Sequence, residues 1–276
     1  MGKTILAIMY DFDKTLSTTD MQNYTFIPRL GLTPDEFWGS TGEFSKKTGC
    51  ERILSYMYMM IVKAKEAGIE LTREFLQDCG KNIKYHPGVT TWFDRINKYG
   101  LDNDVIVEHY LVSSGTKEIL EGCSIFDKFT NVYGCEFYYD ENGRPVWPKL
   151  AINYTQKTQF FFRIAKGVTE VSNDDGVNEK KTELRIPYTN IVYIGDGMTD
   201  VACMTLVNKN HGYSIGVYTD ENKQKVAQIR NDKRCRFVVK ADYSQTSNME
   251  KVMKMIIDDV HNRAVLKEKE QKLANL

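Results

Sequence analysis

The sequence predicts an α/β protein built on a mainly parallel sheet with helices packed against it. Two observations support this prediction. Uninterrupted apolar runs, the pattern of strands buried on both faces, occur at 5–10 and 191–194, and acidic residues follow each of them. Helical patterns separate the predicted strands along the chain, as in strand–helix–strand units whose strands lie parallel.

The composition is that of a globular protein and gives no indication of a nucleic-acid or membrane partner. Lys plus Arg and Asp plus Glu both number 37 in 276 residues, so the formal net charge is zero. No apolar run approaches the roughly 18 residues of a membrane span. The six cysteines are scattered and the N-terminus leads directly into a strand, so we expect a cytoplasmic protein with reduced thiols and no signal peptide. The sequence does not indicate an oligomeric state.

Asp11 and Asp13 follow the first apolar run at its carboxyl end, which is where open parallel sheets bind their ligands. Two carboxylates this close repel each other unless a cation or a shared proton relieves the repulsion. The pair is therefore a candidate for a divalent metal and for nucleophilic and acid–base chemistry. An acidic turn without function is the alternative.

A helical segment is predicted between this acidic pair and the rest of the sheet. Helices are expected over 52–62 and 72–80, and no convincing strand lies between 17 and 86. We therefore predict a helical domain at 17–86, inserted into a core domain formed by 1–16 and 87–276.

The core resumes with a helix over 90–98, which Gly100 is expected to end, and a strand over 104–112. Ser113 and Ser114 follow this strand, ahead of the next helix. Hydroxyl and N–H groups at the start of a helix are suited to binding an anion. The alternative is a serine that only caps the helix.

The remaining elements complete the sheet. A strand over 131–139 ends in an Asn-Gly hairpin turn, and a helix beginning at 155 or 156 carries Lys157 in its first turn. The segment 167–187 is polar and is predicted to be an exposed loop or a short excursion. Further elements are strands at 213–217 and 236–239, a helix at 247–261, and a charged helix or a frayed end from 263.

The strand at 190–194 carries a second acidic pair, Asp196 and Asp200, at its carboxyl end. A parallel sheet brings the ends of its strands to one edge. We therefore expect Asp11, Asp13, Asp196 and Asp200 to converge in space.

Three motifs in this order resemble those of the haloacid dehalogenase-like superfamily of phosphatases. The motif Asp-x-Asp-x-Thr stands at 11–15, an apolar strand ending in serine at Ser113, and Gly-Asp-Gly-x-x-Asp at 195–200. The inserted helices resemble the cap of the phosphoserine phosphatase-like branch. The resemblance implies a Rossmann-like parallel sheet carrying a helical cap domain.

The resemblance also implies roles for these residues. Asp11 would be the nucleophile that forms an aspartyl-phosphate, and Asp13 the general acid and then the base. Mg²⁺ would be held by the Asp11 carboxylate, the Asp13 backbone carbonyl and Asp196. The phosphoryl group would be bound by Ser113, Ser114 and Lys157, with Thr15, Gly195, Gly197 and Asp200 in support.

The sequence leaves three assignments of substrate-binding residues undecided. Lys149 is an alternative to Lys157 as the phosphate-binding lysine. Relatives that hydrolyse phosphoserine carry a glutamate nine residues after the nucleophile, where this chain has Asp20. Asp20 and Arg52 are candidate cap contacts to the substrate, although a solvated helix arginine is the favoured interpretation of Arg52.

We therefore expect a magnesium-dependent phosphomonoesterase acting on a small phosphorylated metabolite. Dehalogenase members of the superfamily lack the second aspartate of the first motif, which favours a phosphate ester as the substrate. The alternatives are phosphotransfer to an acceptor other than water, and a binding module that keeps this fold without turnover.

Overall fold

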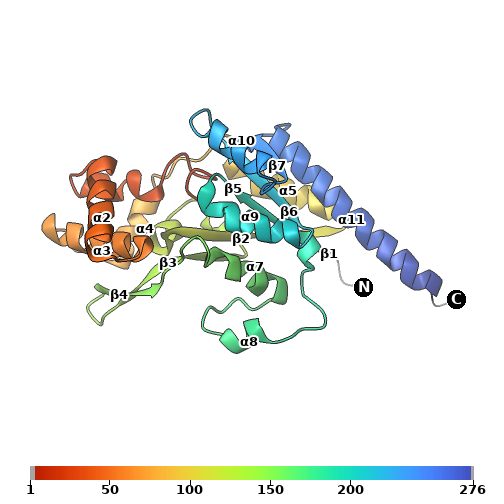
Figure 1. The fold of residues 1–276 in the computed structure, drawn as a ribbon, viewed down its shortest axis with the longest axis horizontal. Helices are drawn as coiled ribbons and strands as arrows, with labels where there is room; N and C mark the ends of the chain where they lie inside the picture. The colour runs from red at the N-terminus through yellow and green to blue at the C-terminus, as the bar shows by residue number, and fades with distance from the viewer. Residues whose placement is uncertain (1–3, 275–276) are drawn as a thin grey trace.

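The computed structural model describes residues 4–274 as a seven-stranded sheet with helices on both faces and further helices beyond one end (Figure 1). The strands are β1 (Thr4–Tyr10), β2 (Val105–Thr116), β3 (Asn131–Tyr139), β4 (Pro145–Leu150), β5 (Ile191–Gly195), β6 (Tyr213–Tyr218) and β7 (Phe237–Lys240). Their order across the sheet is β4-β3-β2-β1-β5-β6-β7. Every neighbouring pair is parallel except the antiparallel hairpin of β3 and β4, which confirms the predicted α/β class.

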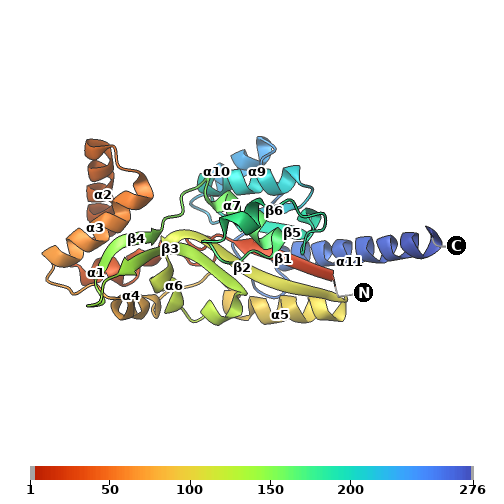
Figure 2. The ribbon, with the colours of Figure 1, turned by 90° about the horizontal axis from the view of Figure 1, so that it is seen from below.

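Within the described residues, five α-helices precede β2, five lie between later strands, and α11 follows the last strand. They are α1 (Phe26–Arg29), α2 (Pro34–Thr48), α3 (Arg52–Glu66), α4 (Arg73–Gly80), α5 (Val89–Asp102), α6 (Lys117–Glu121), α7 (Lys157–Lys166), α8 (Asp174–Asn178), α9 (Val201–Lys209), α10 (Lys223–Asn231) and α11 (Asn248–Ala274). Helices α5 and α11 cover one face of the sheet, and α7 and α9 cover the other (Figure 2).

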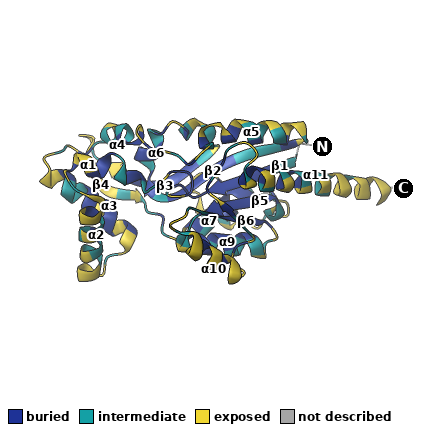
Figure 3. Ribbon diagram, turned by 90° about the horizontal axis from the view of Figure 1, so that it is seen from above, coloured by how far each residue is buried: buried dark blue, intermediate teal, exposed yellow. Residues whose placement is uncertain are grey.

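The core of the protein is the sheet itself, whose central strands are almost entirely buried (Figure 3). Strand β1 lies between β2 and β5, and its residues 6–10 are fully buried, which explains why its sequence is apolar without alternation. Within residues 4–274, no helix combines the length and the apolar character needed to cross a membrane.

Helices α1 to α4 lie between β1 and α5 in sequence and at the carboxyl ends of the parallel strands in space (Figure 1). Thr33 begins α2 with a capping box, in which its side chain and that of Glu36 each accept a backbone N–H. A β-bridge joins Ser17 to Tyr85, so the chain enters and leaves this helical group side by side. Division of the chain into a core and a helical domain stays a prediction.

The predicted ends of one helix and one strand are wrong, and the helix end is wrong because of packing. Helix α5 continues through Gly100, where we expected it to end. A Cβ at Gly100 would lie 2.7 Å from the carbonyl oxygen of Val105, so this glycine lets the helix approach β2 closely. Strand β2 runs past Val112 to Thr116, with a shift of its register against β3 between these residues.

The segment predicted as a loop or short excursion contains ordered structure, and the charged tail takes the helical one of its two predicted forms. The polar segment 167–187 contains α8, and the buried guanidinium of Arg163 donates to the carbonyl oxygens of Glu170, Asn173 and Val171 at 2.8, 3.3 and 2.9 Å. The charged tail continues the last helix, so α11 is one helix that extends beyond the sheet (Figure 1).

Candidate active site at the carboxyl ends of the strands

The carboxylates that follow β1 and β5 meet at one edge of the sheet. The two strands are parallel neighbours, and the N–H of Asp11 donates to the carbonyl of Ile194 at 2.9 Å. Carboxylate oxygens of Asp11, Asp196 and Asp200 lie within 4.8 Å of one another. The predicted convergence of the two acidic pairs is therefore present for these three residues.

Lys157 completes this cluster. It is the first residue of α7, its side chain is buried, and its Nζ donates to Asp11 Oδ1 at 2.7 Å and to Asp200 Oδ1 at 3.0 Å. Burial would lower the pKa of Lys157, but the charges of Asp11 and Asp200 outweigh it and hold this pKa above its usual value. Lys149 instead donates to Glu136 at 3.0 Å. The structure thus places Lys157 rather than Lys149 beside Asp11.

Asp200 is held in place on both of its oxygens. Its Oδ1 also accepts the hydroxyl of Tyr193 at 2.7 Å, and its Oδ2 accepts the N–H groups of Asp196 and Gly197, each at 3.2 Å. A Cβ at Gly195 would lie 2.5 Å from Asp200 Cγ, so this glycine makes room for the carboxylate. Sequence reasoning missed Tyr193, because nothing distinguishes it from the other residues of its apolar run.

Asp13 is positioned by the segment that leads into the helical group. Its Oδ1 accepts the backbone N–H of Met21 at 2.7 Å. Burial raises the pKa of Asp13 well above its usual value, and the negative charges of Asp20 and Asp11 raise it further. A carboxyl group with a raised pKa can hold a proton near neutral pH, as a general acid must.

Two other acids of the cluster, the buried Asp11 and the half-buried Asp196, show the same electrostatic effect. Burial raises the pKa of Asp11 to about 6, even though the charge of Lys157 lowers it. Burial, Asp200 and Asp11 together raise the pKa of Asp196 to about 8. Gathering these carboxylates is therefore costly, and a cation among them would relieve the cost.

The residues at the end of β2 lie beside the helical group. Ser113 is fully buried, and its Oγ accepts the N–H of Gly115 at 2.9 Å. The carbonyl of Ser114 accepts the hydroxyl of Tyr56, from α3, at 2.7 Å, whereas Ser114 Oγ has no hydrogen-bond partner among residues 4–274. Thr15 donates to Asp11 Oδ2 at 3.4 Å.

The two candidate cap contacts are not part of the cluster. Asp20 accepts two hydrogen bonds from Lys14, at 2.8 and 2.9 Å, so its carboxylate is already paired with a cation. Arg52 is exposed at the start of α3, and its side chain makes no hydrogen bond or ion pair with the described part of the chain. Its role in binding a substrate stays a prediction.

Sequence comparisons find a relative and no known family. The chain matches no sequence profile of a known protein family. An uncharacterized protein of Borreliella burgdorferi is 27% identical over 253 residues, which cover 81% of this chain and 87% of that protein.

Similar solved structures carry phosphatase or hydrolase names. A probable phosphoserine phosphatase from Vibrio cholerae superposes with a TM-score of 0.61 at 11% identity, covering 95% of this chain and 67% of that one. A phosphoserine phosphatase determined as a phospho-aspartyl intermediate analogue gives 0.56 at 15% identity, covering 92% and 99%. A hydrolase of the superfamily from Salmonella enterica serovar Typhi gives 0.57 at 14% identity, covering 82% of this chain and 66% of the longer hydrolase. At these identities the matches show the fold alone.

Proposed function

We propose that this chain, which has the haloacid dehalogenase-like fold of the phosphoserine phosphatase type, is a magnesium-dependent phosphomonoesterase that acts on a small phosphorylated metabolite. The observation that carries this proposal is the buried cluster in which Lys157 Nζ lies 2.7 Å from Asp11 and 3.0 Å from Asp200. A lysine and a nucleophilic carboxylate at one sheet edge suit phosphoryl transfer, which depends on positioning and on neutralising charge.

The donor set fits a hard divalent cation. Asp11, Asp196 and Asp200 offer carboxylate oxygens within 4.8 Å of one another, and Mg²⁺ binds through one or two carboxylates together with substrate phosphate oxygens. We assign Asp11, Asp196 and the Asp13 backbone carbonyl as its ligands, because both carboxylate oxygens of Asp200 already accept hydrogen bonds, Oδ1 from Lys157 and Tyr193 and Oδ2 from two backbone N–H groups. When bound, the ion would supply positive charge that offsets the carboxylates and the substrate phosphate.

In the proposed first step, a carboxylate oxygen of Asp11 attacks phosphorus while the bond from phosphorus to the ester oxygen breaks. Asp13 gives its proton to the departing alcohol, which suits its raised pKa. In the second step, Asp13 takes a proton from a water molecule that attacks the aspartyl-phosphate, and phosphate leaves with Asp11 restored. Lys157 and the Ser113 end of β2 would hold the phosphoryl oxygens throughout.

We propose that residues 17–86 act as the cap over this site and determine which leaving group fits. Two of its contacts with the core support the assignment, because they fall at the end of β2 beside Ser113. The Tyr56 hydroxyl donates to the Ser114 carbonyl at 2.7 Å, and the Thr116 hydroxyl lies 3.6 Å from the sulfur of Met60. A cap in this place would exclude water and enclose only a small substrate.

Phosphate release from a broad panel of phosphorylated metabolites, with and without Mg²⁺, tests the proposal. Asp11→Asn serves as the control, because it keeps the size of the side chain and removes the nucleophile. We expect release that requires the metal and that is lost in Asp11→Asn. Transfer to added alcohols at the expense of phosphate release would identify a phosphotransferase instead. A folded protein that binds Mg²⁺ and releases phosphate from nothing would favour a binding module.

A further inference from the structure

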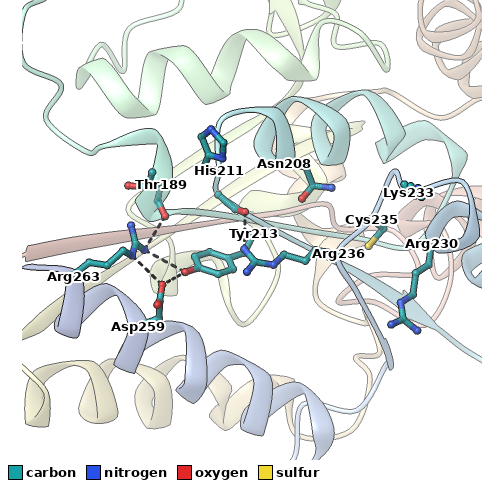
Figure 4. Close-up of a pocket in the computed structure, with 11 residues that line it drawn as sticks. Thr189, Asn208, His211, Tyr213, Arg230, Lys233, Cys235, Arg236, Asp259 and Arg263 are labelled. Carbon is teal, nitrogen blue, oxygen red and sulfur yellow. Dashed lines mark hydrogen bonds and ion pairs between the residues drawn. The ribbon is translucent and has the colours of Figure 1, made fainter.

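A large cavity lies at the opposite edge of the sheet from the acidic cluster. It has a volume of about 720 Å³ and is bounded by the first residue of β6 and by parts of α9, α10 and α11 (Figure 4). This volume is within the range of roughly 300–1,000 Å³ that is typical of small-molecule sites. Most of the charged side chains that line the cavity are basic, although the chain as a whole is neutral.

Three of these basic side chains are not engaged in ion pairs within the described chain. Arg230, Lys233 and Arg236 line the cavity, and none of them forms an ion pair with a carboxylate among residues 4–274. The guanidinium of Arg236 lies over the ring of Tyr213, 4.6 Å from its centre, so its place in the cavity is fixed by an aromatic contact. Three cations around one cavity attract an anion strongly, because their potentials add there.

The wall beside these cations is built from a connected set of polar groups (Figure 4). Arg263 donates to Asp259 at 2.9 Å and to the Thr189 carbonyl at 3.2 Å, and the hydroxyl of Tyr213 also donates to Asp259. Burial would raise the pKa of Asp259, but the hydrogen bond from Tyr213 and the charges of Arg263 and Arg236 hold it below its usual value. Asp259 is therefore compensated chiefly by its bonded partners, which leaves the charges of Arg230 and Lys233 available to a ligand.

The cavity is separate from the proposed active site. Thr189, just before β5, lines it, whereas Asp196 follows the other end of that strand. Strand β5 has five residues, so a rise of roughly 3.3 Å per residue puts its two ends about 13 Å apart. The ligand of the cavity therefore cannot be the substrate phosphate held beside Asp11.

We propose that this cavity binds a small polyanion carrying two or more phosphate or carboxylate groups. Arg230, Lys233 and Arg236 supply the charge that recognises it, and the volume admits a molecule of metabolite size. The competing explanation is structural. Helices α9 and α10 both end beside the cavity, and basic residues at helix C-termini stabilise a fold without binding anything.

Calorimetric titration of the full-length protein with inorganic pyrophosphate and, separately, with citrate tests this proposal. Divalent metal is removed beforehand from the protein and the buffers with a chelating resin, because a soluble chelator such as EDTA is itself a polyanion, and the double variant Arg230→Gln/Lys233→Gln is compared with wild type. Both side chains are exposed and make no hydrogen bond among residues 4–274, so the variant should fold. The matched control is Lys225→Gln/Lys251→Gln, which removes two exposed charges that do not line the cavity.

We expect wild type and the control variant to bind at least one probe with the same dissociation constant. The cavity variant should bind that probe with a dissociation constant at least tenfold higher. Binding of pyrophosphate alone would assign the site to phosphates, and binding of both probes to polyanions in general. The proposal is overturned if wild type binds neither probe, if the cavity variant binds as wild type does, or if both double variants weaken equally. Because the readout is binding without metal, the result does not depend on the proposed phosphatase activity.

Discussion

Lys157 Nζ lies 2.7 Å from Asp11 Oδ1, although 146 residues separate the two in the sequence. The contact joins the first residue of α7 to the end of β1 in a fully buried place. A buried cation here neutralises the carboxylates around it, and it is the group that a phosphoryl oxygen would meet when a substrate binds Asp11. Much of the proposed chemistry therefore depends on this one side chain.

We predict that Lys157→Met lowers kcat by about 10²–10³-fold, the usual effect of removing one group that stabilises transition-state charge. The variant also leaves Asp11 and Asp200 without their buried partner, which costs about 3–5 kcal/mol of folding free energy. Kinetics and thermal unfolding should therefore be measured together, at a temperature where the variant is folded.

The matched control for this prediction is Lys149→Met. Lys149 forms an ion pair with Glu136, but its side chain is 57% exposed, so the pair contributes little. We expect its kcat to stay within about twofold of wild type. Equal losses in the two lysine variants would contradict the assignment of Lys157.

We predict that Gly195→Ala inactivates the site by displacing Asp200. The new Cβ would lie 2.5 Å from Asp200 Cγ, so the carboxylate must move and lose its contacts with Lys157 and Tyr193. We expect at least a tenfold loss of kcat, with a stability cost of about 1–3 kcal/mol from overpacking.

Gly197→Ala is the comparison for that variant. No atom lies within 4 Å of a Cβ placed there, its φ of −155° is extended, and its N–H would still donate to Asp200. Its loss of kcat should be much smaller than that of Gly195→Ala. If the two alanine variants lose activity alike, steric displacement of Asp200 is not the cause.

The sequence was sufficient to place the motif residues, because a parallel sheet brings strand ends to one edge wherever they occur in the chain. Asp11, Asp196 and Asp200 meet for that reason. Their partners could not be predicted in the same way. Tyr193 lies within an apolar run, and only the packing of the sheet shows that its hydroxyl reaches Asp200.

Local patterns also failed where tertiary contacts override them. Gly100 follows a helical pattern and resembles a helix end, yet its lack of a Cβ serves the contact of α5 with β2. The pairing of Asp20 with Lys14 is likewise visible only in three dimensions, and the role of Asp20 in binding a substrate stays a prediction.

We predict that phosphoserine gains nothing from its ammonium group in this protein. Asp20 would have to release Lys14, whose Nζ lies 2.8 Å from it, before it could bind a substrate cation. The kcat/KM values for O-phosphoserine and for its analogue lacking the amine should agree within about threefold. A preference for phosphoserine of tenfold or more would show that the Lys14–Asp20 pair opens for the substrate.

The last prediction concerns His109, which lies in a buried chain of hydrogen bonds. The Trp92 indole N–H can only donate, and it lies 2.9 Å from the Tyr10 hydroxyl oxygen. The Tyr10 hydrogen is then free to donate to His109 Nδ1, and His109 Nε2 to donate to Asn97 Oδ1, each at 2.9 Å. This order of donors requires a neutral imidazole, and burial lowers the pKa of His109 to about 3.

The unfolded chain protonates this histidine near pH 6.5, whereas the folded protein does not until about pH 3. The stability it contributes is therefore fully present above pH 6.5 and is lost as the pH falls from there towards 3. The loss is about 1.4 kcal/mol per pH unit, or about 2 kcal/mol by pH 5. Urea unfolding of wild type and His109→Gln at pH 7.5 and 5.0 measures it. We expect the variant to be less stable at pH 7.5 but to lose about 2 kcal/mol less on acidification, and equal losses would refute the neutral assignment.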